Sequence, residues 1–144
     1  MKYLLAIATS PILLEENKAY WCAIKKFSTS PGDVVFVYVK GKGVSQLFYV
    51  SDNKDKKIMI NCELRAMDTI WLKHIINLSN SLNSKMMKGN LLLSKLEAVR
   101  RNFQGTTFLL SADDASLILK ELVSLNPNNK KELEMINILS VTIP

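Results

Sequence analysis

The chain has little of several residue types that define whole classes of protein. Its 144 residues include two cysteines, one histidine, five glycines and four prolines. Two cysteines cannot build a disulfide framework, and Cys22 and Cys62 lack the C-x-x-C spacing of a zinc site, so reduced thiols are expected. Few glycines and prolines beside 48% hydrophobic residues exclude a disordered chain and a collagen-like fibre. We predict one folded domain over residues 1–144 of a cytoplasmic protein.

Long apolar runs are also missing. No run approaches the ~20 residues that span a bilayer, so no membrane partner is expected. The first residues imitate a signal peptide, but the stretch from Tyr3 to Ala8 is shorter than the roughly 7–15 residues of a signal core. We therefore interpret this stretch as a buried strand.

The usual catalytic patterns are absent too. There is no G-x-x-x-x-G-K-[ST] loop and no G-x-G-x-x-G turn for a nucleotide. His74 stands in an apolar segment, where a place at the edge of a core is more common than catalysis. Asp113 and Asp114 open an expected helix, and capping explains them without a metal. We predict a non-catalytic protein with no cofactor and no metal. A small enzyme that uses Cys22 or His74 stays open as an alternative.

What the chain does have is positive charge, gathered in two stretches. The formal net charge is +6. Residues 73–101 contain six lysines and arginines against Glu97 alone, and residues 18–42 contain five lysines against Asp33 alone. Such polarity suits a polyanion, because each neutralised phosphate releases counterions. A solvated lysine-rich surface is the other interpretation that the charge pattern allows.

Local patterns predict an α+β fold: a small mixed β-barrel of five or six strands flanked by helices. Segments rich in β-branched and aromatic residues between turn residues are the expected strands: 2–9, 33–40, 44–51, 57–64 and 105–110. Segments with helical spacing or end signals are the expected helices: 15–26, a short one from Thr69, 91–101, one opened by Ser111, and 130–139. The helix after Ser111 should bury Ala115, Ile118, Leu119 and Leu122 and end at Asn126-Pro127.

One aromatic residue has an unusual setting. Trp21 lies near the end of the expected first helix, close to Lys25 and Lys26 and upstream of a basic hairpin. A ring beside cations is what a splayed nucleobase needs, because stacking contributes about 1–3 kcal/mol per base. Core packing is the other common role of tryptophan, so Trp21 is a candidate for both.

Five segments together resemble the EVE domain of the PUA-like superfamily, which is related to YTH domains. They are Ala8–Pro11 (ATSP), Tyr20–Ile24 (YWCAI), Pro31–Tyr38 (PGDVVFVY), Gly43-Val44 and Phe103–Ser111 (FQGTTFLLS). The resemblance covers residues 1–123, and residues 126–144 would form a C-terminal helical extension. It implies a PUA-like barrel with an aromatic-lined cleft beside the first strand and first helix. Such a cleft reads a flipped or modified base of DNA or RNA.

The resemblance also implies roles for individual residues. Trp21 would form a wall of the cleft, and Thr9 and Ser10 would contact the edge of the base. Tyr38 would close the cleft. Arg100, Arg101 and Gln104 would bind phosphate or backbone, and Lys40 and Lys42 would flank the entrance of the cleft. Stacking and hydrogen bonds in this cleft must offset the few kcal/mol that flipping a base costs.

Our leading hypothesis is therefore a non-catalytic nucleic-acid-binding domain. A protein-interaction module, such as the specificity subunit of a larger modification or defence system, is the alternative from another class. In that alternative, the basic face would bind an acidic partner.

Overall fold

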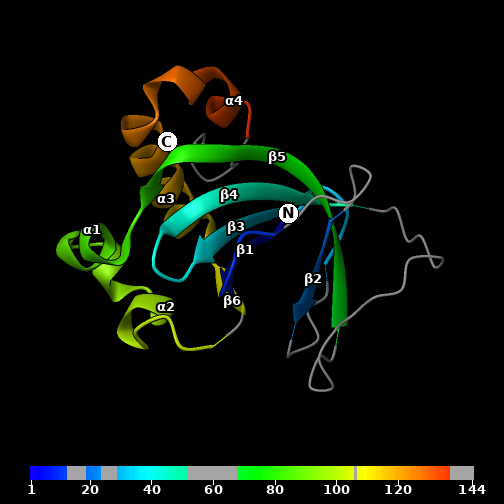
Figure 1. The fold of residues 1–144 in the computed structure, drawn as a ribbon, viewed down its shortest axis with the longest axis horizontal. Helices are drawn as coiled ribbons and strands as arrows, with labels where there is room; N and C mark the ends of the chain where they lie inside the picture. Colours follow the sequence, from blue (N-terminus) through cyan, green and yellow to red (C-terminus); the bar gives the residue numbers. More distant parts are fainter. Residues whose placement is uncertain (13–18, 24–28, 52–67, 106, 137–144) are drawn as a thin grey trace.

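A six-stranded mixed sheet forms the body of the molecule (Figure 1). The computed structural model describes residues 1–12, 19–23, 29–51, 68–105 and 107–136. The strands, taken in chain order, are β1 (Tyr3–Ala8), β2 (Ala19–Ala23), β3 (Val34–Val39), β4 (Gly43–Val50), β5 (Asp68–Leu82) and β6 (Thr107–Leu110). Across the sheet the order is β2-β5-β4-β3-β1-β6. The α+β class predicted from the sequence, five or six strands flanked by helices, is confirmed.

One pair of neighbouring strands, β1 and β3, is parallel, while the other neighbours are antiparallel. β1 runs alongside β3 from Tyr3 opposite Val34 to Ala8 opposite Val39. All six residues of each strand are buried. Strands covered on both faces read as continuous apolar runs, as YLLAIA and VVFVYV do.

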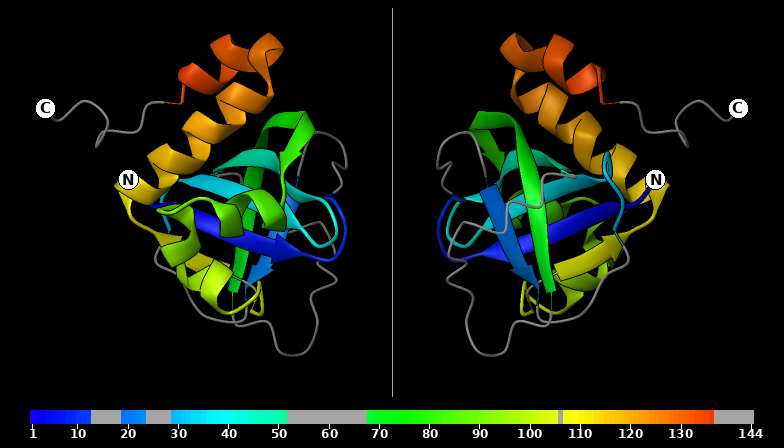
Figure 2. Two further views of the ribbon diagram at one scale, coloured as in Figure 1. Left: turned by 90° about the vertical axis from the view of Figure 1, so that its left-hand side faces the viewer. Right: turned by 90° about the vertical axis from the view of Figure 1, so that its right-hand side faces the viewer.

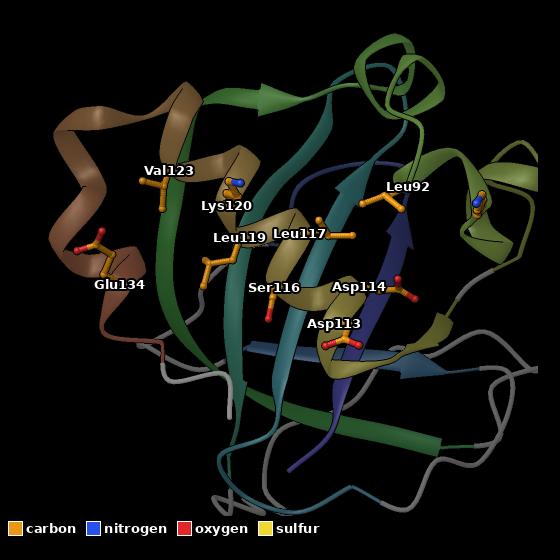
Figure 3. Close-up of a pocket in the computed structure, with 10 residues that line it drawn as sticks. Leu92, Asp113, Asp114, Ser116, Leu117, Leu119, Lys120, Val123 and Glu134 are labelled. Atoms are coloured by element: carbon orange, nitrogen blue, oxygen red, sulfur yellow. The ribbon is translucent and has the colours of Figure 1, made fainter. Parts of the chain in front are cut away.

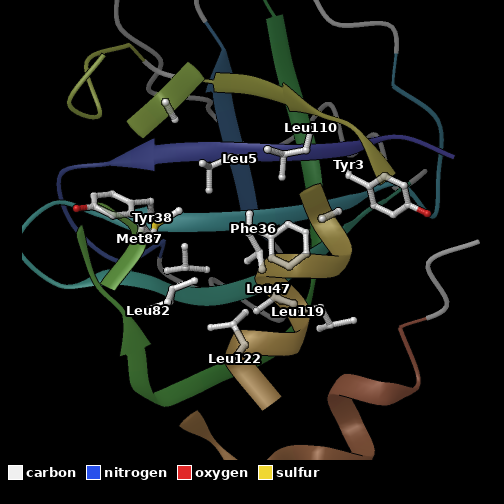
Figure 4. Packing of buried hydrophobic residues seen from close by; sticks show 14 of the residues in the cluster. Tyr3, Leu5, Phe36, Tyr38, Leu47, Leu82, Met87, Leu110, Leu119 and Leu122 are labelled. Atoms are coloured by element: carbon white, nitrogen blue, oxygen red, sulfur yellow. The ribbon is translucent and has the colours of Figure 1, made fainter. Parts of the chain in front are cut away.

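The two faces of this pair belong to two different cores. The helix-side core lies between the sheet and the helices and includes Leu5, Phe36, Leu47, Ile76, Met87, Leu93, Ile118 and Leu122 (Figure 4). The second core lies on the opposite face and includes Leu4, Ala6, Val35, Val37, Phe48 and Leu72. Alternate residues of one strand therefore enter alternate cores, as the two-residue period of a strand requires.

Helices cover one face of the sheet, and α3 runs obliquely across it (Figure 2). The helical elements are α1 (Ser84–Gly89), the 3-10 helix η1 (Leu93–Lys95), α2 (Glu97–Arg100), α3 (Ala112–Leu125), the 3-10 helix η2 (Pro127–Asn129) and α4 (Lys130–Glu134). The Ser111 hydroxyl caps α3 by accepting from the Asp114 N–H at 3.1 Å. The predicted stripe of α3, Ala115, Ile118, Leu119 and Leu122, is buried. Leu133 and Ile136, after α3, belong to the same helix-side core.

The expected helix over 15–26 is wrong for residues 19–23, which form β2 and pair with β5. Trp21 stands opposite Ile70 in this ladder. The prediction followed acidic residues before and lysines after this segment, which match a helix dipole. The aromatic residues Tyr20 and Trp21 favour a strand, and pairing with β5 decides the outcome.

The short helix expected from Thr69 is also wrong, because these residues form β5. The register between β4 and β5 shifts twice, between Val44 and Gln46 and between Leu47 and Phe48. Each bulge changes which side chains face a given core, so the apolar positions no longer alternate along the strand. Broken alternation over a long strand imitates the spacing of a helix.

Other expectations fare better. The strands expected over 2–9, 33–40, 44–51 and 105–110 are confirmed as β1, β3, β4 and β6, and α3 ends at Asn126 as predicted. The expected helix over 91–101 is two shorter pieces, η1 and α2, and α1 before them was not predicted. Asn83 begins α1 by accepting from the Met86 N–H at 2.9 Å. The strand expected over 57–64 lies outside the described residues.

The β3–β4 turn presses against the end of β5 through Gly43. Gly43 has a φ of +116°, and a Cβ added there would meet the Asn83 Cα at 2.6 Å and backbone atoms of Leu82. Gly41, in the same turn, has a φ of +86° but open space around its Cα. Of the two glycines, Gly43 alone therefore combines a positive φ with a clash for any added Cβ.

We predict that Gly43→Ala lowers the free energy of unfolding by more than about 2 kcal/mol, because the turn must move away from β5. Gly41→Ala, the matched control, should cost only the strain of a left-handed residue, about 1 kcal/mol. Urea denaturation followed by circular dichroism measures both. Equal losses in the two variants would contradict the close approach at Gly43.

A buried asparagine fastens the end of α3 to β5. Asn126 is 3% exposed. Its Oδ1 accepts from the Asn80 N–H at 3.0 Å, and its Nδ2 donates to the Asn80 and Leu122 carbonyls at 2.8 and 3.0 Å. Asn80 Nδ2 donates in return to the Leu125 carbonyl at 2.9 Å. The two side chains together satisfy backbone groups on both elements.

We expect Asn126→Ala to lower the free energy of unfolding by about 1–3 kcal/mol, because buried backbone groups lose their partners. Asn128→Ala, at an exposed position two residues further on, should change it by less than about 0.5 kcal/mol. Thermal melts of both variants provide the comparison. A loss in Asn128→Ala as large as that in Asn126→Ala would rule out the fastening role.

Candidate functional site

The carboxyl ends of β1 and β3 lie side by side because the strands are parallel. The Lys40 N–H donates to the Ala8 carbonyl at 2.8 Å, which extends the ladder past both strands. Thr9 and Ser10 follow β1, and Lys40 and Lys42 follow β3; all four are exposed. Two segments that are distant in the sequence thus present hydroxyls and ammonium groups at one end of the sheet.

The β3–β4 turn brings a second set of lysines to this end. Its Gly43 packs against Asn83, which is the N-cap of α1. Lys85 and Lys88 project from α1 and are exposed. Met87, between them, is fully buried and fixes the helix on the core.

A third segment joins through an aromatic stack. The rings of Tyr38 and Phe103 lie 4.0 Å apart with an interplanar angle of 8°. Asn102 and Phe103 adopt positive φ angles of 52° and 58°, which turn the chain sharply after α2. Lys88 Nζ donates to Asn102 Oδ1 at 2.9 Å, so α1 is tied to the same turn.

Arg100, Arg101 and Gln104, on either side of that turn, are exposed. Arg101 and Glu97 form an ion pair, with 3.0 Å between Arg101 Nη2 and Glu97 Oε1, and both side chains are more than half exposed. We call the resulting cluster the basic end: Lys40, Lys42, Lys85, Lys88, Arg100 and Arg101. One acidic residue, Glu97, accompanies these six cations in the described segments that form it.

Behind this end, hydrogen bonds of the Gln46 side chain hold the segment that follows β1. Gln46 is 5% exposed. Its Oε1 accepts from the Ile12 N–H at 2.8 Å, and its Nε2 donates to the Ile12 carbonyl and to Asn77 Oδ1, both at 3.0 Å. A single amide thus fastens the segment after Ser10 to β4 and β5.

Asn77, which Gln46 contacts, also fixes the position of His74. Asn77 Oδ1 can only accept, so His74 Nε2, 3.0 Å away, carries the hydrogen of that contact. The half-buried ring of His74 stands edge-on against Phe48, with centroids 5.4 Å apart. Its place in the structure is thus a satisfied position at the edge of the second core.

The structure brings most of the expected site residues together. Thr9, Ser10, Lys40, Lys42, Arg100, Arg101 and Gln104 are exposed around the same end of the sheet. Tyr38 is 5% exposed, and its ring is held in the helix-side core by Phe103. Trp21 lies on β2, and its side chain is outside the described residues, as is that of Cys22.

Four residues of this region were not singled out from the sequence: Lys85, Lys88, Gln46 and Asn77. The lysines were counted in a charged stretch, but their place beside Lys42 depends on the approach of Gly43 to Asn83. Gln46 is a polar residue inside an apolar strand segment, VSQLF, and this signal could have marked it as buried and bonded.

A groove of about 740 Å³ opens elsewhere, along the outer side of α3 (Figure 3). Its lining residues are Leu92, Lys95, Asp113, Asp114, Ser116, Leu117, Leu119, Lys120, Val123 and Glu134. Charges of both signs border its apolar floor in similar number, so it lacks the excess of cations found at the basic end.

In the part of the chain that the structure describes, no three His, Cys, Asp or Glu side chains gather as metal ligands would. None of the described helices has the length and apolar character needed to cross a membrane.

Comparisons with known proteins identify the fold. No family model and no curated protein matches the chain. Among solved structures, a protein from Pseudomonas putida aligns with a TM-score of 0.63 at 15% identity, covering 83% of this chain and 99% of its own. A hypothetical protein from Leishmania major gives 0.62 at 14%, covering 86% and 96%. Human THYN1 protein, solved with DNA containing 5-methylcytosine, gives 0.60 at 9%, covering 85% and 98%. The chain therefore has the PUA-like fold that its sequence motifs resemble.

Proposed function

We propose that this protein is a non-catalytic nucleic-acid-binding domain whose basic end holds the phosphate backbone. The observation that carries the proposal is the convergence of six exposed cations from three segments at one end of the sheet. Phosphates attract such a cluster through charge and counterion release. Exposed hydroxyls of Thr9 and Ser10 stand beside the cations and can accept or donate hydrogen bonds to a base edge.

The proposal extends to the reading of one flipped or modified base. The complex of human THYN1 with DNA containing 5-methylcytosine supports this extension, because that protein has the same fold. In this chain, the segment after β1 is held by Gln46 at both backbone groups of Ile12, so Thr9 and Ser10 sit on a fixed support. A fixed donor and acceptor set is what discrimination between base edges needs.

A non-catalytic role agrees with the state of the histidine. His74 Nε2 is engaged by Asn77, and the ring edge rests on Phe48. These contacts explain His74 as a structural residue.

The first prediction concerns the cations of the β3–β4 turn. Lys40→Ala with Lys42→Ala should weaken binding to plain and modified oligonucleotides alike, by about tenfold near physiological salt, because two phosphate contacts are lost. The slope of log affinity against log salt should shrink by about 1.8. Fluorescence anisotropy at several salt concentrations measures both quantities.

Lys130→Ala with Lys131→Ala is the matched control, because both lysines are exposed on α4 and carry the same total charge. This control should leave the salt slope unchanged. If the two double variants behave alike, nonspecific charge rather than the basic end accounts for binding.

The second prediction concerns Trp21. Trp21→Ala should abolish the preference for a 5-methylcytosine-containing oligonucleotide over the plain one, while the salt slope stays the same, because stacking and phosphate contacts are independent. Trp21→Phe, which keeps an aromatic ring, should retain part of the preference. Anisotropy titrations with DNA and RNA versions of both oligonucleotides make the measurement. Unchanged preference in a folded Trp21→Ala protein would remove this residue from the site.

A further inference from the structure

The turn between α1 and η1 exposes two neighbouring leucines. Leu91 is 78% exposed and Leu92 is 51% exposed, and Met86 on the adjoining helix is 44% exposed. Single exposed apolar residues are common on protein surfaces, but this turn presents a small apolar tip.

The turn is rigidly built, so the tip is held outward. Asn90 Oδ1 accepts from the N–H groups of Leu92 and Leu93, both at 3.0 Å. Ser94 Oγ donates to the Leu91 carbonyl at 3.0 Å, and the Ser94 N–H donates to the Asn90 carbonyl at 2.8 Å. Leu93 is fully buried and anchors the turn in the helix-side core. The backbone that carries Leu91 is therefore ordered before it meets a partner, which lowers the entropy cost of binding.

Lysines flank the tip on the side that continues into the basic end. Lys85 and Lys88 precede it and are exposed. On the side of α3, Leu92 and Lys95 line a groove together with Asp113 and Asp114. Lys88 also contacts Asn102, so the tip continues directly into the basic end. The matching partner is apolar inside and anionic outside.

A stacked nucleic-acid duplex has this layout, with bases inside and phosphates outside. An anionic membrane shares it, but anchoring there needs a broad apolar helix face, and α1 has six residues with Met87 turned into the core. The duplex also explains why the cations extend to Lys40 and Lys42 on the β3–β4 turn.

Resting on the function proposed above, we propose that Leu91 is a wedge that enters the base stack of a bound duplex. It would fill the space that a flipped base leaves and so stabilise the extruded state. Apolar side chains such as leucine and methionine separate base steps in this way, against an unstacking cost of a few kcal/mol. The lysines around the tip would hold the neighbouring phosphates.

The test compares Leu91→Ala with Leu109→Ala. Leu109 is a matched control because it is also exposed, at 61%, but it pairs with Leu4 on β1, toward the opposite end of that strand from Thr9. The probe is a DNA duplex with 2-aminopurine beside a central 5-methylcytosine, since 2-aminopurine brightens when stacking is lost. The same strand without its complement, and phosphatidylserine vesicles, serve as further probes.

We expect wild type and Leu109→Ala to raise the 2-aminopurine signal on the duplex and Leu91→Ala to lose most of that rise. Leu91→Ala should bind the duplex about fivefold more weakly but the single strand within about twofold of wild type, because a single strand has no paired stack to open. An unchanged duplex signal in Leu91→Ala would overturn the wedge while salt-dependent binding kept the proposed function. Loss of vesicle binding with intact duplex binding would also overturn it. A wild-type protein that binds neither strand nor duplex would remove both proposals.

Discussion

The parallel pairing of β1 with β3 is the constraint on which the rest of the structure depends. Covering both faces of these strands requires two cores, and the uninterrupted apolar runs YLLAIA and VVFVYV satisfy both. Parallel direction also places both carboxyl ends together, where the Lys40 N–H meets the Ala8 carbonyl. The candidate site is therefore a product of strand direction: an antiparallel pair would put Thr9 and Lys40 at opposite ends of the sheet.

Sequence patterns predicted the elements in which local preference and environment agree. β3 has β-branched residues between turn residues, and α3 has Ser111 as its cap and an apolar stripe, so both could be predicted. β2 and β5 could not be predicted in this way. Helix-like charges flank one of them, and two register shifts disturb the alternation of the other, so only their mutual pairing reveals them as strands.

The residues of the candidate site likewise fall into those that sequence motifs could select and those that long-range contacts place. Thr9, Ser10, Lys40 and Lys42 stand directly after strands, and motif resemblance was sufficient to select them. The position of Lys85 beside them depends on Gly43 packing against Asn83, two residues that are far apart in the sequence. Gln46 belongs to the same class, because its two bonds to Ile12 span β4 and the chain after β1. Contacts of this kind are set by topology and leave only faint marks in a single sequence.

The place of β1 ahead of both its sheet partners in the chain has a consequence for biosynthesis. Its two neighbours in the sheet are β3 and β6, and Tyr3 stands opposite Leu110, which follows much later in the sequence. During translation this apolar strand emerges before both of its sheet partners, so it has none until β3 emerges, and one of its edges stays open until β6 follows. Unpaired apolar edges invite association between chains. Nascent copies are therefore most vulnerable to aggregation before residue 110 is made, and co-translational chaperones that shield extended apolar segments would act in that interval.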